Sequence, residues 1–282
     1  MFNEALNKLL DMFKSIKQKV KKFKDEFNMA NVYIIGNRAS KSCKAIADNT
    51  GIRKYTGQKA DVLVNYGLSG EKFELFFRKY PSATKIPMIN KRVGRSKYSV
   101  IKEVEQEVDV PETRLSVPET AKLSDWIEKR VHSSQGRGII AARGRGKLVG
   151  KYYQKMVKDR KYELRVHAFS WIPKKDWAVH KRIGPPDQIA WNFHQGGHFQ
   201  SVKSPNNHEI FIDAKDISEK ILRIMGMSFG AVDFIVDNSM KIYFIEINSS
   251  PGFSELSEGI YFDAMAKLKA LPVAEIRKLA SK

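Results

Sequence analysis

Two apolar runs near the end of the chain constrain the fold most strongly, because each carries polar side chains that need partners once they are buried. Residues 232–236 and 242–247 are separated by a short polar stretch, which predicts two antiparallel strands joined by a hairpin turn. Asp233 lies in the first strand, whereas Glu246 and Asn248 lie two residues apart in the second and therefore share a face. Burying a carboxylate among isoleucines without a cation nearby is costly. We therefore expect this hairpin to face a cation.

The three polar side chains of the hairpin have the chemistry of a magnesium site. Two carboxylates and an amide oxygen on one face form an oxygen-rich set, which Mg²⁺ prefers and usually completes with phosphate oxygens. The alternative is structural, with the carboxylates in buried ion pairs to basic side chains of the protein. The sequence favours the metal, and the predicted ligands are Asp233, Glu246 and Asn248.

A small loop rich in Ser and Gly, residues 133–138, forms the second candidate site. Residues 126–131 alternate as a strand does, and a second apolar run at 139–142 follows the loop. Small residues let backbone amides approach a phosphate closely, and Lys129 adds a positive charge nearby. Glycine loops between strands are also common as simple turns. The candidate residues of this glycine loop are Ser133, Ser134, Gln135, Gly136 and Gly138.

Basic and amide side chains further along form the third candidate site. Arg165 lies in a predicted strand two residues after Glu163 and faces the same way, so the alternative is a simple surface ion pair. Arginine can hold a carboxylate or phosphate through two parallel hydrogen bonds, which makes Arg165 and Arg182 candidate anion-binding residues. Asn192 precedes a Gly-Gly pair within residues 173–207, a stretch rich in Pro, Gly, Asn and His that predicts an irregular loop region.

The organisation of the chain changes along its length. Residues 2–27 carry apolar residues every three or four positions with many lysines between them, which predicts an amphipathic basic helix. Such a helix either packs on the protein body or a second subunit, or lies on a membrane or nucleic acid. Residues 31–90 alternate strand and helix, as parallel sheets do, whereas residues 125–153 have the short strands and turns of an antiparallel sheet.

In their order along the chain, these motifs resemble the ATP-grasp family of carboxylate–amine ligases, and within it the RimK-like branch. Residues 127–139 resemble the family's lysine strand and glycine loop, and residues 163–165 resemble its acid-x-Arg strand. Residues 192–197 match Asn-x-x-x-Gly-Gly, while 230–233 and 246–252 match the metal-binding end. Each motif alone is weak, but five in this order are specific. Compact ligases of this type also resemble bacteriophage products.

The resemblance, which covers residues 95–260, implies an α/β fold of the ATP-grasp type. A small parallel α/β lobe precedes two α+β lobes, and ATP is expected between those two. The chain is then expected to divide into an amphipathic basic helix at 1–29, a small N-terminal α/β lobe at 30–90, a central lobe with the glycine loop at 91–155, and a C-terminal lobe with the metal site at 156–282.

The resemblance also implies how ATP would be bound. Lys97 and Lys129 would bind its phosphates together with the glycine loop. The connector that contains Gln154, Met156 and Val157 would hold the adenine through backbone groups. The three predicted metal ligands would hold one or two Mg²⁺ ions, for which Mn²⁺ can substitute.

The remaining implied roles concern the substrates. Arg165 and Asn192 would steady the transferred phosphoryl group and the acyl phosphate, and Arg182 would hold a substrate carboxylate. Lys155 is a departure, since the family often carries a glutamate near the ribose in this connector.

The activity implied by the resemblance is the ATP- and Mg²⁺-dependent formation of an amide bond through an acyl phosphate. A carboxylate attacks ATP and an amine then displaces phosphate, so a metal ion, lysines and arginines are the useful catalysts. The expected partners are ATP, a carboxylate substrate and an amine substrate. An amino acid joined to a protein, a peptide or another large acidic acceptor is the expected reaction.

The charge of the chain supports an acidic partner. Fifty Lys and Arg residues stand against 31 Asp and Glu residues, a formal net charge of +19 that the candidate site does not account for. The excess favours a large acidic acceptor. It also motivates the alternative function, a basic nucleic-acid-binding protein on a degenerate ATP-grasp scaffold.

Two absences narrow the class of protein further. No run of 18 apolar residues occurs, so no transmembrane segment is predicted. Cys43 is the single cysteine, which excludes an internal disulfide and a cysteine-rich zinc site and favours a cytoplasmic location. Formation of a homo-oligomer through the N-terminal helix is a further expectation.

Overall fold

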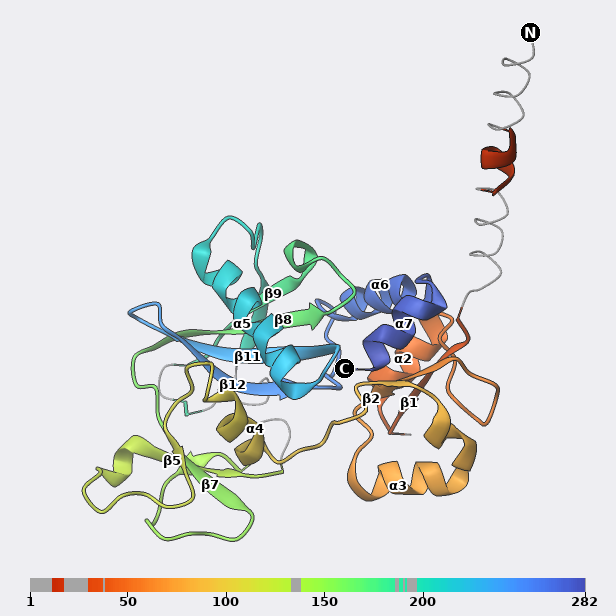
Figure 1. Ribbon diagram of the computed structural model, residues 1–282. Coiled ribbons are helices and arrows are strands. Elements are labelled where there is room, and N and C mark those ends of the chain that lie inside the picture. Colours follow the sequence, from red (N-terminus) through yellow and green to blue (C-terminus); the bar gives the residue numbers. More distant parts are fainter. Residues whose placement is uncertain are drawn as a thin grey trace.

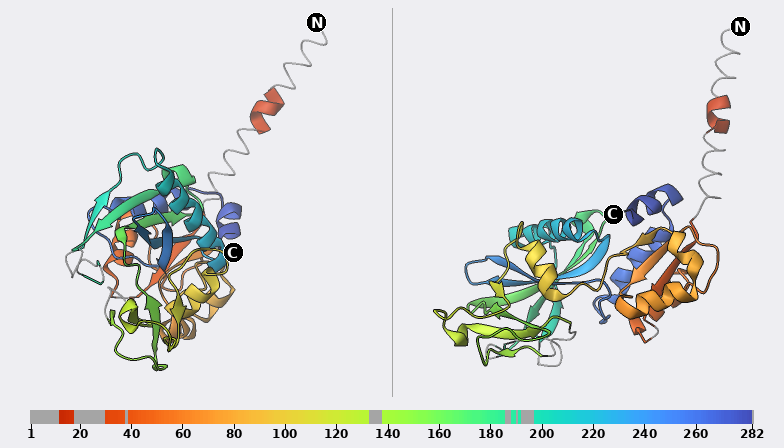
Figure 2. Two further views of the ribbon diagram at one scale, coloured as in Figure 1. Left: turned by 90° about the vertical axis from the view of Figure 1, so that its left-hand side faces the viewer. Right: turned by 60° about the horizontal axis from the view of Figure 1, so that its bottom comes forward.

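The computed structural model describes residues 12–17, 30–37, 39–132, 138–185, 188–189, 191 and 197–281. Three sheets lie along an elongated body, one in each lobe (Figures 1 and 2). The first sheet is parallel, and the two that follow it in the sequence are antiparallel. The predicted α/β architecture is therefore confirmed.

The N-terminal lobe is a parallel sheet in the order β1-β2-β3. Its strands are β1 (Val32–Gly36), β2 (Val62–Tyr66) and β3 (Met88–Ile89). Each crossover contains a helix, α2 (Lys41–Asn49) after β1 and α3 (Gly70–Lys79) after β2. All five residues of β2 are buried, because this central strand has helices on both faces of the sheet.

The central lobe is an antiparallel sheet in the order β4-β7-β5-β6. Its strands are β4 (Thr113–Arg114), β5 (Trp126–Arg130), β6 (Ile140–Ala141) and β7 (Lys151–Lys155). One face of β5 and β7 directs Ile127, Lys129 and Gln154 toward the third lobe. The opposite face packs Trp126 and Tyr153 into a separate small core. Because successive side chains of a strand point to opposite faces, one face of this sheet forms a core and the other faces the candidate site.

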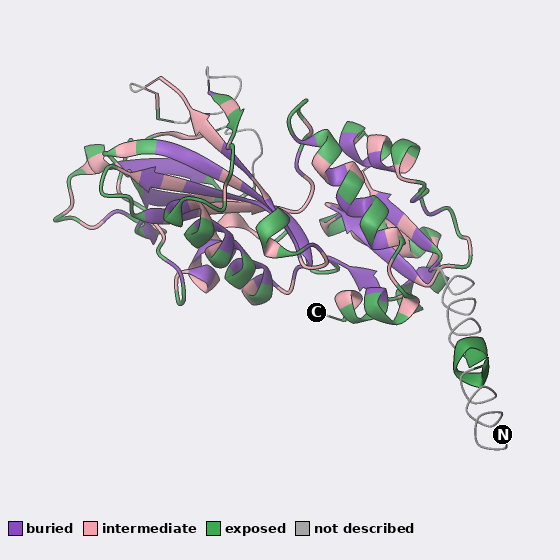
Figure 3. Ribbon diagram, turned by 90° about the horizontal axis from the view of Figure 1, so that it is seen from above, coloured by how far each residue is buried: buried purple, intermediate pink, exposed green. Residues whose placement is uncertain are grey.

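The third lobe is an antiparallel sheet in the order β10-β9-β8-β11-β12, with α5 (Glu209–Met225) across one face (Figure 1). Long apolar strands form its centre, and Figure 3 shows them as mostly buried. They are β8 (Arg160–Phe169), β11 (Phe229–Asp237) and β12 (Ile242–Asn248). α4 (Lys97–Val104) packs beside this sheet against α5 and β12.

The structure corrects the prediction of an irregular loop region at 173–207. This stretch contains a 3-10 helix (Lys174–Asp176) and two strands, β9 (Ala178–Ile183) and β10 (His198–Ser201), which extend the sheet beyond β8. The long strand β8 supplies backbone partners for β9, and β9 does so for β10, which the polar composition did not indicate. Two further 3-10 helices span Pro81–Lys85 and Leu123–Asp125.

The last two helices return to the N-terminal lobe. α6 (Glu258–Lys269) contacts α2, and α7 (Val273–Ala280) contacts β2 and β3. Figure 1 shows both helices beside the first sheet, although they follow the third sheet in the sequence. The predicted division of the chain by residue number stays a prediction, and such a division separates these helices from the lobe on which they pack.

A buried asparagine joins the N-terminal lobe to the third lobe. Asn90 follows β3 with a φ of +56° and is only 2% exposed. Its side chain accepts a hydrogen bond from the Ser228 amide and donates one to the Phe229 carbonyl, both at the start of β11. Close by, the Tyr66 hydroxyl donates to the Pro251 carbonyl at 2.8 Å. The end of the parallel sheet is thereby attached to the sheet that carries the predicted metal ligands.

Only a short part of the predicted N-terminal helix is described. Residues 12–17 are helical and exposed, including the apolar side chains of Met12, Phe13 and Ile16. Residues 1–11 and 18–29 lie outside the described part of the chain, so the roles expected of this helix remain predictions. Among the helices that are described, none is long and apolar enough to span a membrane.

Replacing Asn90 with alanine should destabilise the protein, because buried backbone groups of Ser228 and Phe229 lose their partners while the positive φ remains. We expect a loss of roughly 2–4 kcal/mol in the free energy of unfolding, measured by denaturant titration. Asn90→Gly is the matched control, since glycine adopts a positive φ without strain. Its loss of stability therefore reports the missing hydrogen bonds alone. Wild-type stability of Asn90→Ala would contradict the assigned junction.

Candidate active site

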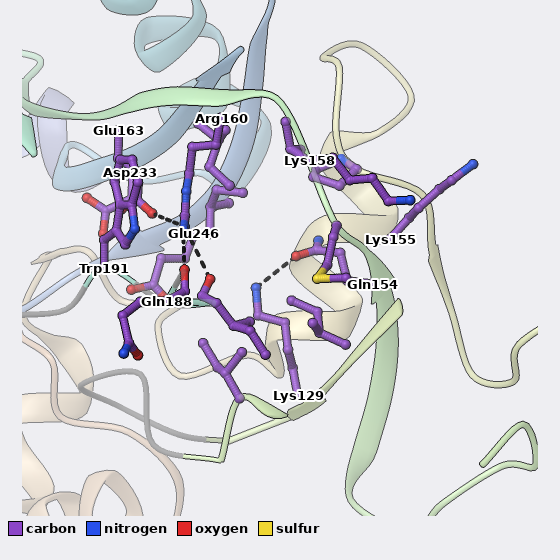
Figure 4. A pocket seen from close by; sticks show the side chains of 18 of the residues that line it. Lys129, Gln154, Lys155, Lys158, Arg160, Glu163, Gln188, Trp191, Asp233 and Glu246 are labelled. Atoms are coloured by element: carbon purple, nitrogen blue, oxygen red, sulfur yellow. Dashed lines mark hydrogen bonds and ion pairs between the residues drawn. The ribbon is translucent and has the colours of Figure 1, made fainter. Parts of the chain in front are cut away.

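A cavity of about 410 Å³ lies between the central sheet and the sheet of the third lobe (Figure 4). The sequence positions of its lining residues are widely separated, and Lys97 and Glu246 are 149 positions apart. Eight residues predicted from the sequence line this cavity, namely Lys97, Lys129, Gln154, Met156, Val157, Arg182, Asp233 and Glu246. The fold therefore brings the predicted nucleotide-binding and metal-binding residues together.

The predicted hairpin of β11 and β12 is present, and a β-bulge turns its acidic residues toward the cavity. The register shifts just after Asp233 and its partner Glu246, which leaves Ile245 as an extra residue in β12. As a result, Ile245 and Glu246 both line the cavity despite being adjacent in sequence. Asn248 lines an adjoining cavity of about 80 Å³ together with Lys97 and Glu246. The three predicted ligands thus lie at one end of the hairpin.

Asp233 is held by Arg165, which lies opposite it on β8. Arg165 donates two hydrogen bonds, from Nε to Oδ1 at 2.6 Å and from Nη2 to Oδ2 at 2.7 Å. Burial raises the pKa of the Asp233 carboxyl, but the charge and hydrogen bonds of Arg165 outweigh burial and hold that pKa below its usual value. Asp233 is therefore a buried anion of fixed orientation.

Glu246 is bound by Lys97, whose Nζ contacts the Oε2 atom of Glu246. Lys97 is the first residue of α4, and Ser96 caps this helix by accepting a hydrogen bond from the Ser99 amide. The Lys97 amide donates to the Val131 carbonyl at 2.9 Å, next to the end of β5. Lys97 is consequently anchored to the central lobe by its backbone and to the third lobe by its side chain.

Lys129 enters the cavity from the central sheet and is 7% exposed. Its Nζ donates to Gln154 Oε1 at 2.8 Å, and Gln154 Nε2 donates to Thr113 Oγ1 at 3.0 Å. Burial lowers the pKa of Lys129 to about 8, while the charge of Glu246 opposes this shift and the charge of Lys97 adds to it. The side chain of Gln154 is thus engaged in orienting Lys129.

A second buried acid, Glu163, lies between two arginines. Arg160 Nη1 is 3.0 Å from Glu163 Oε1, and Arg182 Nη2 contacts Oε2. Burial raises the pKa of Glu163 above its ordinary value, although both arginines oppose this shift. The Arg160 guanidinium also lies 3.8 Å from the centre of the Trp191 ring. No motif in the sequence marks Arg160 or Trp191, and the signal that the sequence offers is their proximity to the third group of candidate residues.

Apolar side chains form another part of the cavity wall. They come from both sheets, from the residue before β6 and from the connector after β7, and are Ile127, Ile139, Met156, Val157, Ile235 and Ile245. A cavity with apolar walls beside a group of cations suits a ligand that joins a flat, weakly polar ring to an anionic group.

Two buried histidines lie on the same face of the sheet as Arg165. His167 Nδ1 is 3.2 Å from the Tyr261 hydroxyl, and His167 Nε2 is 3.2 Å from His180 Nδ1. Burial, and then the charge of Arg165, lower the pKa of His180 to about 4, and burial lowers that of His167. Both pKa values lie below the ordinary histidine value, which favours the neutral rings, and both rings contact other buried side chains of the sheet.

Five of the predicted residues lie outside the described part of the chain, namely Ser133, Ser134, Gln135, Gly136 and Asn192. Gly138 has a φ of +77°, and a Cβ at this position would meet the Arg130 side chain. Gly138 does not line the cavity. The roles given to these six residues stay predictions.

The described residues fit a Mg²⁺ ion that brings further oxygen ligands with it. The side chains of Asp233, Glu246 and Asn248 end in the oxygen donors that Mg²⁺ prefers. Within the described ranges, however, no group of three or more His, Cys, Asp or Glu residues could hold a metal ion. Both carboxylates also have cationic partners, Arg165 and Lys97. Phosphate oxygens are the ligands that would complete such a site.

Comparison with known sequences gives a partial match. No protein-family model matches the chain. A probable alpha-L-glutamate ligase of Histophilus somni strain 2336 is 25% identical over 171 residues, which covers 55% of this chain and 54% of that protein. Its counterpart in strain 129Pt matches equally. The chain therefore spans about half the length of the curated relatives it matches.

Solved structures match over most of the chain. An ATP-grasp ligase of Chryseobacterium gregarium, in complex with ADP and a leader and core peptide, has a TM-score of 0.56 at 15% identity, covering 84% of this chain and 95% of that one. A Bacillus anthracis D-alanine–D-alanine ligase complexed with ATP gives 0.54 at 11%, covering 88% and 97%. A Microcystis aeruginosa macrocyclase bound with its precursor peptide gives 0.52 at 12%, covering 86% and 99%.

These likenesses establish the architecture. The chain has the ATP-grasp fold, and the predicted resemblance to ATP-grasp ligases is confirmed at that level. The alternative of a nucleic-acid-binding protein gains no support, since none of the similar proteins described above is named for nucleic-acid binding.

Replacing Glu163 with glutamine should destabilise the third lobe, because Arg160 and Arg182 stay charged while their shared partner becomes neutral. We expect a loss of roughly 3–5 kcal/mol in the free energy of unfolding, measured by denaturant titration. Glu112→Gln is the matched control, since Glu112 pairs with exposed Arg114 and should cost less than about 1 kcal/mol. Equal losses for the two variants would contradict the buried network.

Proposed function

We propose that the protein is an ATP- and Mg²⁺-dependent ligase that joins a carboxylate to an amine through an acyl phosphate. The observation that carries the proposal is the convergence of Lys97 and Lys129 with Asp233 and Glu246 in one cavity. Phosphoryl transfer needs cations for the phosphate oxygens and carboxylates for a divalent ion. The ligase character of the similar proteins agrees with this assignment.

The nucleotide would lie with its base in the apolar part of the cavity and its phosphates beside the two lysines. Met156 and Val157 follow β7 and line the cavity, so their backbone groups are suitably located for the adenine edge. Lys155 also lines the cavity, and no glutamate stands near the ribose at this position. The similar structures that contain ATP or ADP support ATP as the phosphoryl donor.

The chemistry follows from the charges of the described residues. A substrate carboxylate oxygen attacks the γ-phosphorus, the bond to the bridging oxygen breaks, and ADP leaves with the electron pair. Lys97 and Lys129 would stabilise the negative charge on the phosphate oxygens. A bound Mg²⁺ would supply further neutralisation of those oxygens. Arg165 keeps Asp233 ionised and oriented for that ion.

Bond formation completes the reaction. The amine attacks the acyl carbon, and phosphate leaves from the tetrahedral intermediate. Arg182 is proposed to hold the substrate carboxylate, since its Nε is buried and makes no hydrogen bond within the described part of the chain. Asn192 is proposed to assist at the acyl phosphate.

The acceptor is proposed to be a peptide or protein that carries acidic groups. Its support is the net charge of +19 and the precursor peptides in two of the similar structures. The relative from Histophilus somni suggests glutamate as an amino acid to add. A screen of ATP hydrolysis with amino acids, nucleotides, peptides and DNA tests this proposal. Turnover stimulated by DNA alone would reject it and favour nucleic-acid binding.

Replacing Asp233 with asparagine should abolish ATP turnover, because the substitution removes a buried negative charge at the proposed metal site. We expect a loss of at least about a thousandfold in turnover, measured as phosphate release with the stimulating substrates. Asp213→Asn, the same change at an exposed position on α5, is the control and should leave turnover unchanged. Undiminished turnover in Asp233→Asn would reject the proposed mechanism.

Nucleotide affinity should fall as the pH rises above about 8, because Lys129 loses its proton near that value. Below this pH, Lys129 is charged and attracts the phosphates; above it, binding must first return the proton, which weakens affinity by up to about tenfold per pH unit. Lys129→Arg should flatten this profile, since a guanidinium stays protonated. Calorimetric titration of an ATP analogue measures both profiles, and a constant wild-type affinity would contradict the prediction.

A further inference from the structure

We infer that Lys97 and a divalent cation are alternative partners of Glu246, and that the nucleotide phosphates decide between them by drawing Lys97 away. Metal and nucleotide then bind with positive coupling through this one lysine. The inference rests on the proposed function, because it takes a nucleoside triphosphate as the ligand. It adds that the phosphates draw Lys97 away from Glu246 and that the cation then takes its place, an order that the identity of the ligands does not specify.

The charges around the predicted ligands motivate this exchange. Asp233 and Glu246 supply two negative charges, and Asn248 is neutral. Arg165 binds both oxygens of Asp233, and Lys97 binds Glu246, so the two carboxylates are already neutralised by two cations of the protein. Arg182 also lies close, with its Nη2 3.9 Å from Asp233 Oδ2, but its charge is balanced by Glu163. Arg160 and Lys129 add two further positive charges to the cavity. A dication meeting this set alone would face repulsion without a compensating anion.

The two protein cations differ in how firmly they are fixed. Arg165 lies on β8 between two strands of the same sheet, and its guanidinium makes two parallel hydrogen bonds to Asp233. Lys97 makes a single contact with Glu246, through a flexible side chain that is 22% exposed and lines the cavity. An ammonium on a long side chain can change partners with little disturbance of the backbone. Lys97 is therefore the cation that can leave.

The position of Lys97 gives it a second acceptor. Its backbone is anchored to the Val131 carbonyl, two residues before the glycine loop, while its side chain crosses to β12. The Lys129 ammonium is close enough that Lys97 and Glu246 both affect its pKa. Phosphates bound by Lys129 would thus lie within the same group of charges. They would attract the Lys97 ammonium and add oxygen ligands for the cation that replaces it at Glu246.

Binding of Mn²⁺ to the full chain, followed by the loss of the free-ion signal in electron paramagnetic resonance, tests the exchange. Wild-type protein should bind Mn²⁺ at least about tenfold more tightly with a non-hydrolysable ATP analogue than without it. In Lys97→Met, Mn²⁺ affinity without the analogue should rise by about tenfold, and the gain from the analogue should shrink. Lys97→Gln is a second variant, which keeps a polar side chain at the start of α4.

The control removes an equal charge elsewhere in the cavity. Lys155 lines the cavity, but its Nζ lies 4.0 Å from Glu112 Oε2 and pairs with none of the predicted ligands within the described part of the chain. Lys155→Met should therefore bind Mn²⁺ as the wild type does without the analogue. If Lys155→Met gains as much affinity as Lys97→Met, the effect is one of overall charge and the inference is overturned.

The outcomes separate this inference from the proposed ligase activity. Equal Mn²⁺ affinity of wild type and both Lys97 variants without the analogue overturns the exchange, whatever a ligation assay gives. A gain in Mn²⁺ affinity confined to the Lys97 variants supports the exchange even if no ligation is found, in which case the ligase proposal alone fails.

Discussion

The ion pair between Asp233 and Arg165 is the interaction on which the candidate site depends. It lies across two neighbouring central strands of a five-stranded sheet, where an unpaired carboxylate would be strongly disfavoured. Because both hydrogen bonds are formed within the sheet, the carboxylate keeps its charge and its orientation before any ligand binds. A second buried ion-pair group lies two residues before Arg165 on β8, where Glu163 binds Arg160 and Arg182 at the cavity. The sheet is therefore both the core of the lobe and the support of its charges.

The cavity lies between two sheets that present side chains of different charge to one another. The central sheet contributes Lys129, oriented by Gln154, and the third lobe contributes the acidic residues. Lys97 connects the two, since its backbone is bound to one lobe and its side chain to the other. The N-terminal lobe is attached to the same sheet through Asn90 and through the returning helices α6 and α7. A ligand that alters the Lys97 contact would therefore act on the relation between lobes.

Several elements of this fold can be predicted from the pattern of neighbouring residues in the sequence. Others depend on contacts between segments, which that pattern does not report. The hairpin, the parallel first sheet and the lysine strand are predictable because apolar runs and turn residues lie close together in sequence. The strands β9 and β10 escaped prediction because pairing of β9 with β8, and of β10 with β9, stabilises a polar stretch that has no strand pattern of its own. The stacking of Arg160 on Trp191 was also not predicted, because the two residues lie in different segments of the chain. The bulge at Ile245 lies within the predicted hairpin, but a change of register leaves no mark in the apolar pattern.

The sequence by itself determined the chemical content of the site, namely two acids and an amide on a hairpin, lysines before them and a motif order that resembles ATP-grasp ligases. Only the tertiary structure decided which cation each acid meets. Arg165 pairs with Asp233 and Lys97 with Glu246, although the family resemblance implied phosphate groups as the partners of both basic residues. The physical reason is that ion pairing in a buried site depends on distance and desolvation in space, whereas periodicity along the chain reports only which face a residue occupies.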